Sequence, residues 1–105
     1  MSDSFIILWK FRAKKGRETE FEKAYGPGGD WVRFFKNGKG FIKTELYQDT
    51  NGEYLTVDEW ASKEAYEEFK RFHQREYQEL DKNFEALTES EVHIGSFVRP
   101  ASFFK

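Results

Sequence analysis

The pattern of apolar residues is clearest in residues 54–80, where it changes from one period to another. Residues 54–60 are rich in the aromatic and β-branched types that suit a strand. After Ser62, whose hydroxyl can accept from the free N–H groups of a helical turn, apolar residues recur at steps of three to five. They are Ala65, Tyr66, Phe69, Phe72, Tyr77, Leu80 and Phe84. We therefore expect a strand that runs directly into a long amphipathic helix with a bend near His73.

Three other stretches have strand patterns, namely residues 5–12, 41–49 and 88–98. The turn Asp49-Thr50-Asn51-Gly52 follows the second of them, and Asn-Gly tolerates positive φ at both central positions of a hairpin. In that strand, alternation places Ile42, Thr44 and Leu46 on one side and Phe41, Lys43, Glu45 and Tyr47 on the other. In the last strand it places Val92, Ile94 and Val98 on one face and His93, Gly95 and Phe97 on the other. We expect a hairpin and a returning final strand.

Two shorter stretches, residues 17–25 and 30–35, have helical spacing. Gly26-Pro27-Gly28-Gly29 ends the first, and Asp30 can cap the second. The glycine stretch is not a phosphate-binding loop, because it follows a helix and lacks the Lys-Ser/Thr pair. The order β-α-β-β-α-β with right-handed crossovers predicts a ferredoxin-like α+β fold, a four-stranded antiparallel sheet with helices on one face. A chain of 105 residues should form a single domain spanning residues 1–105.

Two apolar features need a cover that these helices cannot supply. The first strand is apolar on both faces, with Ile6 and Leu8 on one side and Ile7, Trp9 and Phe11 on the other. The helices can cover one side, so a second copy of the chain is the simplest cover for the other, and we expect a homodimer. The adjacent Phe103 and Phe104 should also dock against the protein.

Composition and charge exclude several kinds of partner and site. The chain has no cysteine, which excludes disulfides, thiol catalysis and cysteine–metal sites. Seventeen Lys and Arg against nineteen Asp and Glu, interspersed, argue against nucleic acid as a partner. No apolar run approaches the ~20 residues of a membrane span, and no charged-then-apolar leader opens the chain. We expect a cytoplasmic protein with no membrane contact.

Aromatic residues make up 19% of the chain, and several lie on separate elements that can converge between sheet and helices. They are Trp9, Tyr25, Trp31, Phe35, Tyr66, Phe69, Tyr77 and Phe97. Two interpretations are open: a solid aromatic core, or an apolar cavity for a flat aromatic or hydrophobic small molecule. For the cavity, the predicted substrate-binding residues are Trp9, Tyr25, Trp31, Phe35, Phe69 and Tyr77.

A few titratable residues stand among apolar neighbours. Asp58, if it points inward, must be paired or protonated, although an ion pair near a strand end also explains it. His73 and His93 are either hydrogen-bonded structural histidines or groups that contact a ligand or move a proton. Asp81 and Glu85 are explained by a solvated helix face. We take His73 and Asp58 as the catalytic candidates, and the histidine spacing offers no metal site.

Several stretches resemble the antibiotic biosynthesis monooxygenase superfamily, in particular its small stand-alone members. They are Glu20-Phe21-Glu22-Lys23-Ala24-Tyr25-Gly26-Pro27, Gly29-Asp30-Trp31, Gly40-Phe41-Ile42-Lys43-Thr44-Glu45-Leu46, and Thr56-Val57-Asp58-Glu59-Trp60 with Ser62 and Ala65-Tyr66. The resemblance runs from Ile6 to about Phe97 and implies a dimeric α+β barrel, in which two ferredoxin-like sheets pack face to face. Characterised members oxidise polycyclic aromatic intermediates without metal or flavin, so no cofactor is implied. Other members degrade haem, and many have no established substrate.

The haem-degrading branch of this superfamily uses an Asn on the first strand, a Trp on the long helix and a His further along it. Those positions here hold Trp9, Phe69 and Glu79, with His73 displaced by more than a turn. The resemblance therefore gives haem binding or degradation the least support.

Two functions fit these sequence features and the resemblance. The first is a cofactor-independent monooxygenase acting on a small aromatic substrate, with aromatic side chains shaping the cavity and His73 or Asp58 handling a proton. The second is a non-enzymatic dimeric module of the same fold that binds a small ligand or another protein. The lack of an obvious polar constellation in the sequence favours the second.

Overall fold

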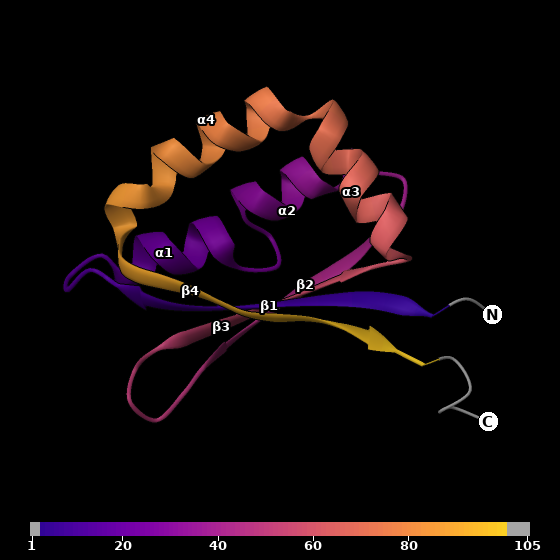
Figure 1. The fold of residues 1–105 in the computed structure, drawn as a ribbon. Helices are drawn as coiled ribbons and strands as arrows, with labels where there is room; N and C mark the ends of the chain where they lie inside the picture. The colour runs from indigo at the N-terminus through magenta and orange to yellow at the C-terminus, as the bar shows by residue number, and fades with distance from the viewer. Residues whose placement is uncertain (1–2, 101–105) are drawn as a thin grey trace.

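The computed structural model describes residues 3–100, which form a sheet covered by helices (Figure 1). The strands are β1 (Ser4–Ala13), β2 (Phe41–Gln48), β3 (Tyr54–Trp60) and β4 (Thr88–Arg99). The helices are α1 (Glu18–Tyr25), α2 (Asp30–Phe35), α3 (Lys63–Phe72) and α4 (Gln74–Phe84), with a 3-10 turn, η1 (Glu85–Leu87), before β4. Each expected strand and helix is present, and Phe103 and Phe104 lie outside the described residues. Within residues 3–100, no helix is long and apolar enough to cross a membrane.

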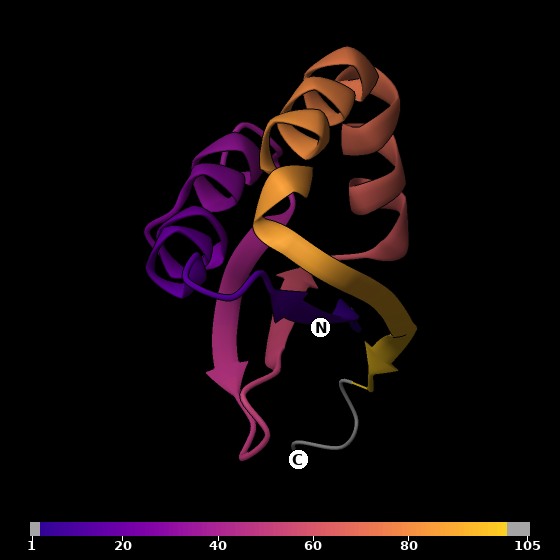
Figure 2. The same ribbon diagram turned by 90° about the vertical axis from the view of Figure 1, so that its left-hand side faces the viewer.

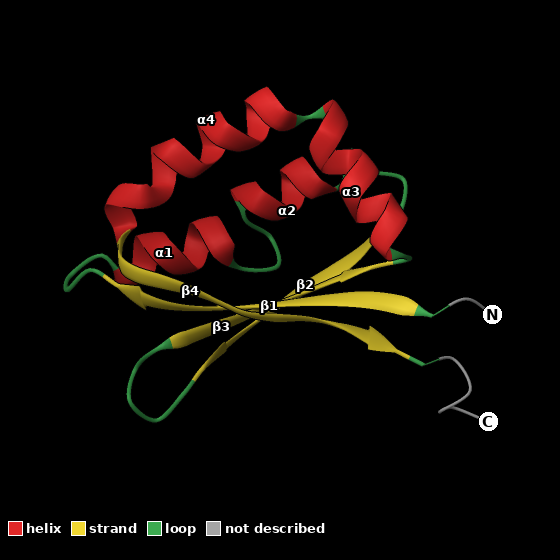
Figure 3. Ribbon diagram, viewed as in Figure 1, coloured by secondary structure: helices red, strands yellow, loops and turns green. Residues whose placement is uncertain are grey.

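The four strands form one antiparallel sheet in the order β2-β3-β1-β4. Figure 3 shows the helices gathered on one face of the sheet, and Figure 2 shows the same two layers after a 90° turn. The β1 and β3 strands are neighbours in the centre although β2 separates them in sequence, as two interlocked crossovers require. This is the predicted ferredoxin-like α+β fold.

The two faces of the sheet follow the alternation predicted for β1. The inward side chains of this strand that are buried under the helices are Phe5, Ile7, Phe11 and Ala13. On the opposite side, the strand register aligns the apolar residues Ile6, Leu8, Leu55, Val57, Val92 and Phe97. We call this side the outer face. No helix covers it, and Val92 and Phe97 are about half exposed (58% and 49%).

Irregularities in the ladders change which side chains face inward at two places. A register shift between Leu8 and Trp9 makes His93 the partner of Trp9, with ring centroids 5.0 Å apart, whereas Phe97 pairs with Ile6 on the outer face. The prediction that His93 and Phe97 share a face, and that Val92 and Val98 share the other, was therefore wrong. The extra residue of a β-bulge reverses the alternation beyond it.

A second shift, in the β2–β3 ladder, overturns the predicted side for Phe41. The shift lies between Phe41 and Lys43, and it turns the Phe41 ring toward the helices. That ring lies 5.3 Å from Trp60 and 5.5 Å from Phe35, measured between centroids.

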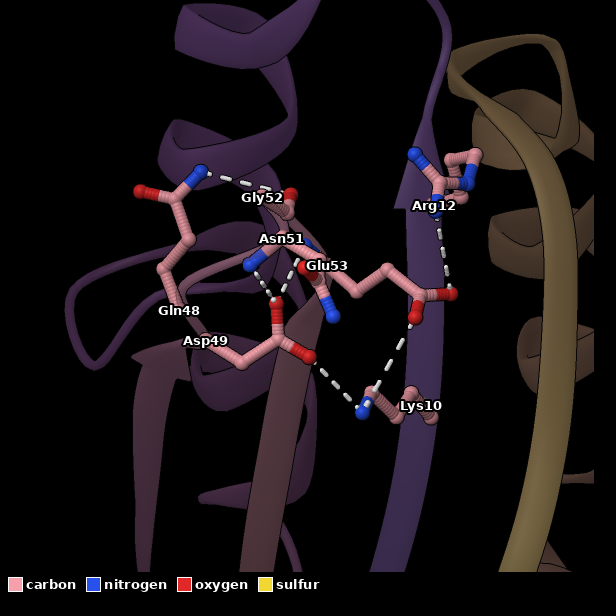
Figure 4. A network of polar contacts seen from close by, with 7 residues as sticks. All are labelled: Lys10, Arg12, Gln48, Asp49, Asn51, Gly52 and Glu53. Carbon is pink, nitrogen blue, oxygen red and sulfur yellow. Dashed lines mark hydrogen bonds and ion pairs between the residues drawn. The ribbon is translucent and has the colours of Figure 1, made fainter.

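The β2–β3 hairpin is closed by the predicted turn, but with different backbone angles. Within this turn only Gly52 has a positive φ (87°), and no non-glycine residue of 3–100 does, so Asn51 does not use its tolerance of that region. Instead, the Asp49 carboxylate accepts from the backbone N–H groups of Asn51 and Glu53 at 2.9 and 3.0 Å. Figure 4 shows the same carboxylate paired with Lys10 of β1 at 2.8 Å. The hairpin is thus held to the neighbouring strand.

The long helical pattern is divided in two, as the predicted bend indicated. Ser62 caps α3 by accepting from the Ala65 N–H at 3.0 Å. His73 has φ −121° and ψ 27°, between α3 and α4, and its N–H still donates to the carbonyl of Phe69 at 3.0 Å. The helical ladder therefore ends at His73 and a new one begins.

Asp30 does not cap α2. The capping position is Gly29, and Asp30 is the first helical residue, where its carboxylate pairs with Arg33 at 2.9 Å. The backbone at Gly29 packs against the end of α1, where a Cβ would lie 2.4 Å from the carbonyl oxygens of Lys23 and Ala24. Only glycine fits there, and α2 begins without a side-chain cap.

Candidate functional site

A cavity of about 270 Å³ lies between the sheet and the helices. The sheet contributes Trp9, Phe11, Thr44, Thr56, Asp58 and Glu91, and the helices contribute Tyr25, Trp31, Phe35, Lys70, Tyr77 and Asp81. Ligand pockets usually have volumes of about 300–1,000 Å³, so this one suits a small molecule.

Aromatic side chains make half of the cavity lining and hold one another in place. The Trp31 ring lies 5.2 Å from Tyr77, 5.7 Å from Phe35 and 6.0 Å from Tyr25, measured between centroids. The contacts with Tyr77 and Tyr25 join α2 to α4 and to α1, and the contact with Phe35 lies within α2. The wall is therefore preformed and matches the flat faces of an aromatic ligand.

Asp58 is the buried carboxyl of the cavity. It is 9% exposed, and its Oδ1 accepts a 2.7 Å hydrogen bond from the Thr44 hydroxyl on the neighbouring strand. Burial raises the pKa of Asp58 to about 6, and the hydrogen bond from Thr44 opposes that rise. A carboxyl with such a pKa can take up and release a proton close to neutral pH.

The tyrosines around Asp58 remain protonated at neutral pH. Burial raises the pKa of both Tyr25 and Tyr77 well above the ordinary value, and it raises the pKa of Tyr66 to about 12. Their hydroxyl groups therefore act as hydrogen-bond donors and not as bases.

Charged side chains also line the cavity. The Lys70 ammonium lies 4.8 Å from the ring centroid of Tyr77 and 5.5 Å from that of Tyr66, within the range of cation–π contacts. Partial burial, with the nearby charges of Asp81 and Glu85, raises the pKa of Glu91. With Asp58 and the two threonines, one cation, three carboxyl groups and two hydroxyl groups thus line the cavity beside its aromatic side chains.

The structure brings together six of the eight predicted site residues. Asp58, Trp9, Tyr25, Trp31, Phe35 and Tyr77 all line the cavity. Phe69 and His73 do not; they line a second hollow of about 520 Å³ that runs along α3. Phe69 packs between Trp60 and His73, with centroids 5.1 and 4.6 Å away, and the His73 Nδ1 lies 3.2 Å from the Glu76 carboxylate.

Five polar residues of the cavity were not among the predicted site residues. Thr44 and Thr56 lie at inward positions, on the same side of the sheet as Asp58, so strand alternation could have identified them. Lys70, Asp81 and Glu91 carry no such signal, because each looks like an ordinary solvated charge. In residues 3–100, no group of three or more His, Asp or Glu side chains is arranged to hold a metal ion.

Residues 4–80 match the family model described as Antibiotic biosynthesis monooxygenase. No curated protein matches the sequence significantly. Among solved structures, a mutant of SnoaB, a cofactor-independent oxygenase from Streptomyces nogalater, is similar with 20% identity and a TM-score of 0.70 over 91% of this chain and 92% of that one. A proposed antibiotic biosynthesis monooxygenase from Bordetella bronchiseptica is similar with 15% identity and a TM-score of 0.64 over 93% and 94%. At these identities the structural similarity concerns the fold.

Proposed function

The chain belongs to the antibiotic biosynthesis monooxygenase family, and on this basis we propose that it is a cofactor-independent monooxygenase acting on a small aromatic substrate. One observation carries the proposal: Asp58, a buried carboxyl with a pKa near 6, faces a preformed aromatic cavity. The similarity to a cofactor-independent oxygenase from Streptomyces nogalater supports the same reaction type.

The proposed substrate has an acidic CH2 group beside an aromatic ring and a carbonyl. The Asp58 carboxylate removes one proton, and the resulting anion transfers an electron to O2 before the two radicals combine into a hydroperoxide on that carbon. Loss of the second C–H proton and cleavage of the O–O bond give a C=O group and water. The balance is CH2 + O2 → C=O + H2O, so the substrate supplies the electrons.

The aromatic walls supply orientation and exclude water from the reacting anion. Trp9, Trp31 and Tyr77 present ring faces or edges to the cavity, and a flat ligand between them has few orientations available. A carbanion in such a site is less hydrated than in water, which favours electron transfer to O2.

Oxygen uptake with anthrone, a three-ring ketone with an acidic CH2 group, tests the proposal. We expect one O2 consumed per anthraquinone formed without H2O2 release, and a loss of about 100-fold in kcat in Asp58→Asn. Asp49→Asn makes the same chemical change at the hairpin, away from the cavity, and should retain activity. Absence of turnover with anthrone and related hydroxylated aromatic ketones would overturn the proposal.

A ligand-binding module with an inert cavity is the second candidate. The observation that favours it is the small volume, about 270 Å³, which limits how far a substrate and O2 can be accommodated together. A thermal shift with aromatic ketones that is not accompanied by oxygen uptake would support this candidate over the enzyme.

We also propose that the protein is a homodimer that packs outer face against outer face. The support is the row of apolar side chains on that face, which the helices of the same chain leave uncovered. Apolar side chains gathered on one exposed face commonly mark an interaction surface.

A further inference from the structure

The indole N–H of Trp31 is a buried hydrogen-bond donor without an acceptor. Trp31 is 7% exposed, and its Nε1 atom has no hydrogen-bond partner within residues 3–100. The ring cannot turn to find one, because Tyr25, Phe35 and Tyr77 pack around it. All four residues line the cavity that contains Asp58.

A buried donor without an acceptor loses its hydrogen bond to water and gains none in return, so such groups are rare and often have a function. The protein has a natural comparison in Trp60, whose Nε1 is also without a partner. Trp60 is fully buried among Phe35, Phe41 and Phe69 and does not line the cavity. Of these two donors, only Trp31 lies where a ligand can reach.

The Tyr25 hydroxyl lies close to the same donor. Its interaction with Trp31 partly opposes the rise that burial causes in the pKa of Tyr25, although the Trp31 N–H does not meet hydrogen-bond geometry with it. A tyrosine hydroxyl can rotate, so both groups can donate to one oxygen atom placed between them.

We propose that Trp31 N–H and Tyr25 O–H together bind one acceptor oxygen of the aromatic ligand. This inference rests on the proposed function and deepens it, since it assigns the two side chains that bind the carbonyl oxygen of the aromatic ketone. When Asp58 removes a proton beside a carbonyl, negative charge moves onto the carbonyl oxygen. Two donors directed at that oxygen stabilise the anion, as in an oxyanion hole.

The test compares two ligands that differ by one oxygen atom, 1-tetralone and tetralin. Proton–nitrogen NMR spectra resolve the indole N–H signals of Trp9, Trp31 and Trp60, and Trp31→Phe assigns the signal in question. We expect 1-tetralone to shift the Trp31 signal downfield by about 0.5 ppm or more, whereas tetralin leaves it nearly unchanged. The Trp60 signal, outside the cavity, should move with neither ligand.

Trp31→Phe and Tyr25→Phe keep the aromatic rings and remove one donor each. Each should weaken 1-tetralone binding by about 5- to 10-fold, the effect of one neutral hydrogen bond, and change tetralin binding by less than about 2-fold. Because Tyr25→Phe deletes a single oxygen atom, it keeps the test usable if Trp31→Phe fails to fold.

The outcomes separate this inference from the proposed function. If 1-tetralone binds and the Trp31 signal stays in place, or if both variants lose the two ligands equally, the two-donor site is refuted while oxygenase activity stands. If neither compound binds, the two-donor site is refuted as well. A shifted Trp31 signal in a protein that shows no oxygen uptake supports the site and refutes the oxygenase.

Discussion

Asp58 is where the stability and the proposed chemistry of this protein oppose each other. Its carboxyl is buried with one hydrogen bond, from Thr44, and with no cation paired to it in the described part of the chain. Burying a charged carboxylate without a counter-ion is unfavourable, which is why the pKa rises. The same arrangement gives a base whose proton affinity suits neutral pH.

The raised pKa predicts how the free energy of unfolding depends on pH. The pKa of Asp58 in the folded protein is about 6 against an ordinary value of 3.8, so the folded state binds the proton more tightly than the unfolded state. Asp58 therefore imposes no penalty below about pH 4 and destabilises the fold increasingly as the pH rises from about 4 to 6. The full penalty is about 3 kcal/mol.

Asp58→Asn should remove this penalty while lowering kcat of the proposed oxygenase reaction by about 100-fold. Urea unfolding at pH 7.5 should show the variant more stable by about 2–3 kcal/mol, with the two proteins nearly equal at pH 4. Glu20 and Asp49, whose pKa values their ion-pair partners lower, contribute equally to both curves and cancel in the difference. Parallel stability curves across this range would show that Asp58 titrates normally.

Thr44→Val tests whether the hydroxyl tunes Asp58. Its hydrogen bond lowers the pKa of Asp58, so its removal should move the acidic limb of the kcat/KM profile to higher pH by about half a unit to one unit. Thr56→Val is the matched control, because Thr56 lines the same cavity and forms no hydrogen bond to Asp58. An equal displacement of the limb in both variants would point to a general change of polarity.

Among the elements, α3 shows how one side chain fixes where a helix begins. Ser62 accepts from Ala65 N–H, and Glu64 in the first turn complements the positive end of the helix. Ser62→Ala should lower the free energy of unfolding by about 1 kcal/mol, measured by urea denaturation, whereas Ser62→Asp should retain most of it. If both substitutions cost the same, the cap contributes nothing and the effect is one of packing.

The elements were largely predictable, because alternation in β1 and the helical spacing after Ser62 report burial directly. The bulge opposite Trp9 could not be predicted, because an extra residue in a strand does not change the apolar pattern of the sequence. That bulge determines which faces of the sheet His93 and Phe97 occupy. The site was predictable where strand parity applied, as for Asp58 and Thr44. The presence of Lys70, Asp81 and Glu91 in the site could not be predicted, because their positions depend on how the helices pack against the edge strand β4.

The bend at His73 explains the misplaced members of the predicted site. In the sequence, α3 and α4 share one continuous apolar face. The change of direction at His73 divides this face, so that its two halves pack against different neighbours. Tyr77 of α4 reaches the cavity, whereas Phe69 of α3 packs onto Trp60 and Phe34. Periodicity identifies a buried face and cannot say which neighbour buries it.

At the scale of the whole molecule, the proposed dimer depends on the outer face. Leu8 lies near its centre, between Val57 on β3 and Gly95 on β4. Leu8→Lys should convert a dimer into a monomer in light scattering, with circular dichroism unchanged, because it places a charge in an apolar contact. Thr50→Lys adds the same charge in the hairpin turn and should remain dimeric. A wild-type protein that runs as a monomer would refute the dimer.

The arrangement of α4 has a consequence for how a ligand enters the cavity. Tyr77 and Asp81 border the cavity, and α4 has no fully buried residue, since it packs on the core through the partly buried Tyr77, Leu80 and Phe84. An element held by partly buried side chains can open locally while the sheet, α1 and α2 keep their packing. An apolar ligand could therefore reach Asp58 without a permanent channel. The opening rate of α4 would then set the rates of ligand binding and release.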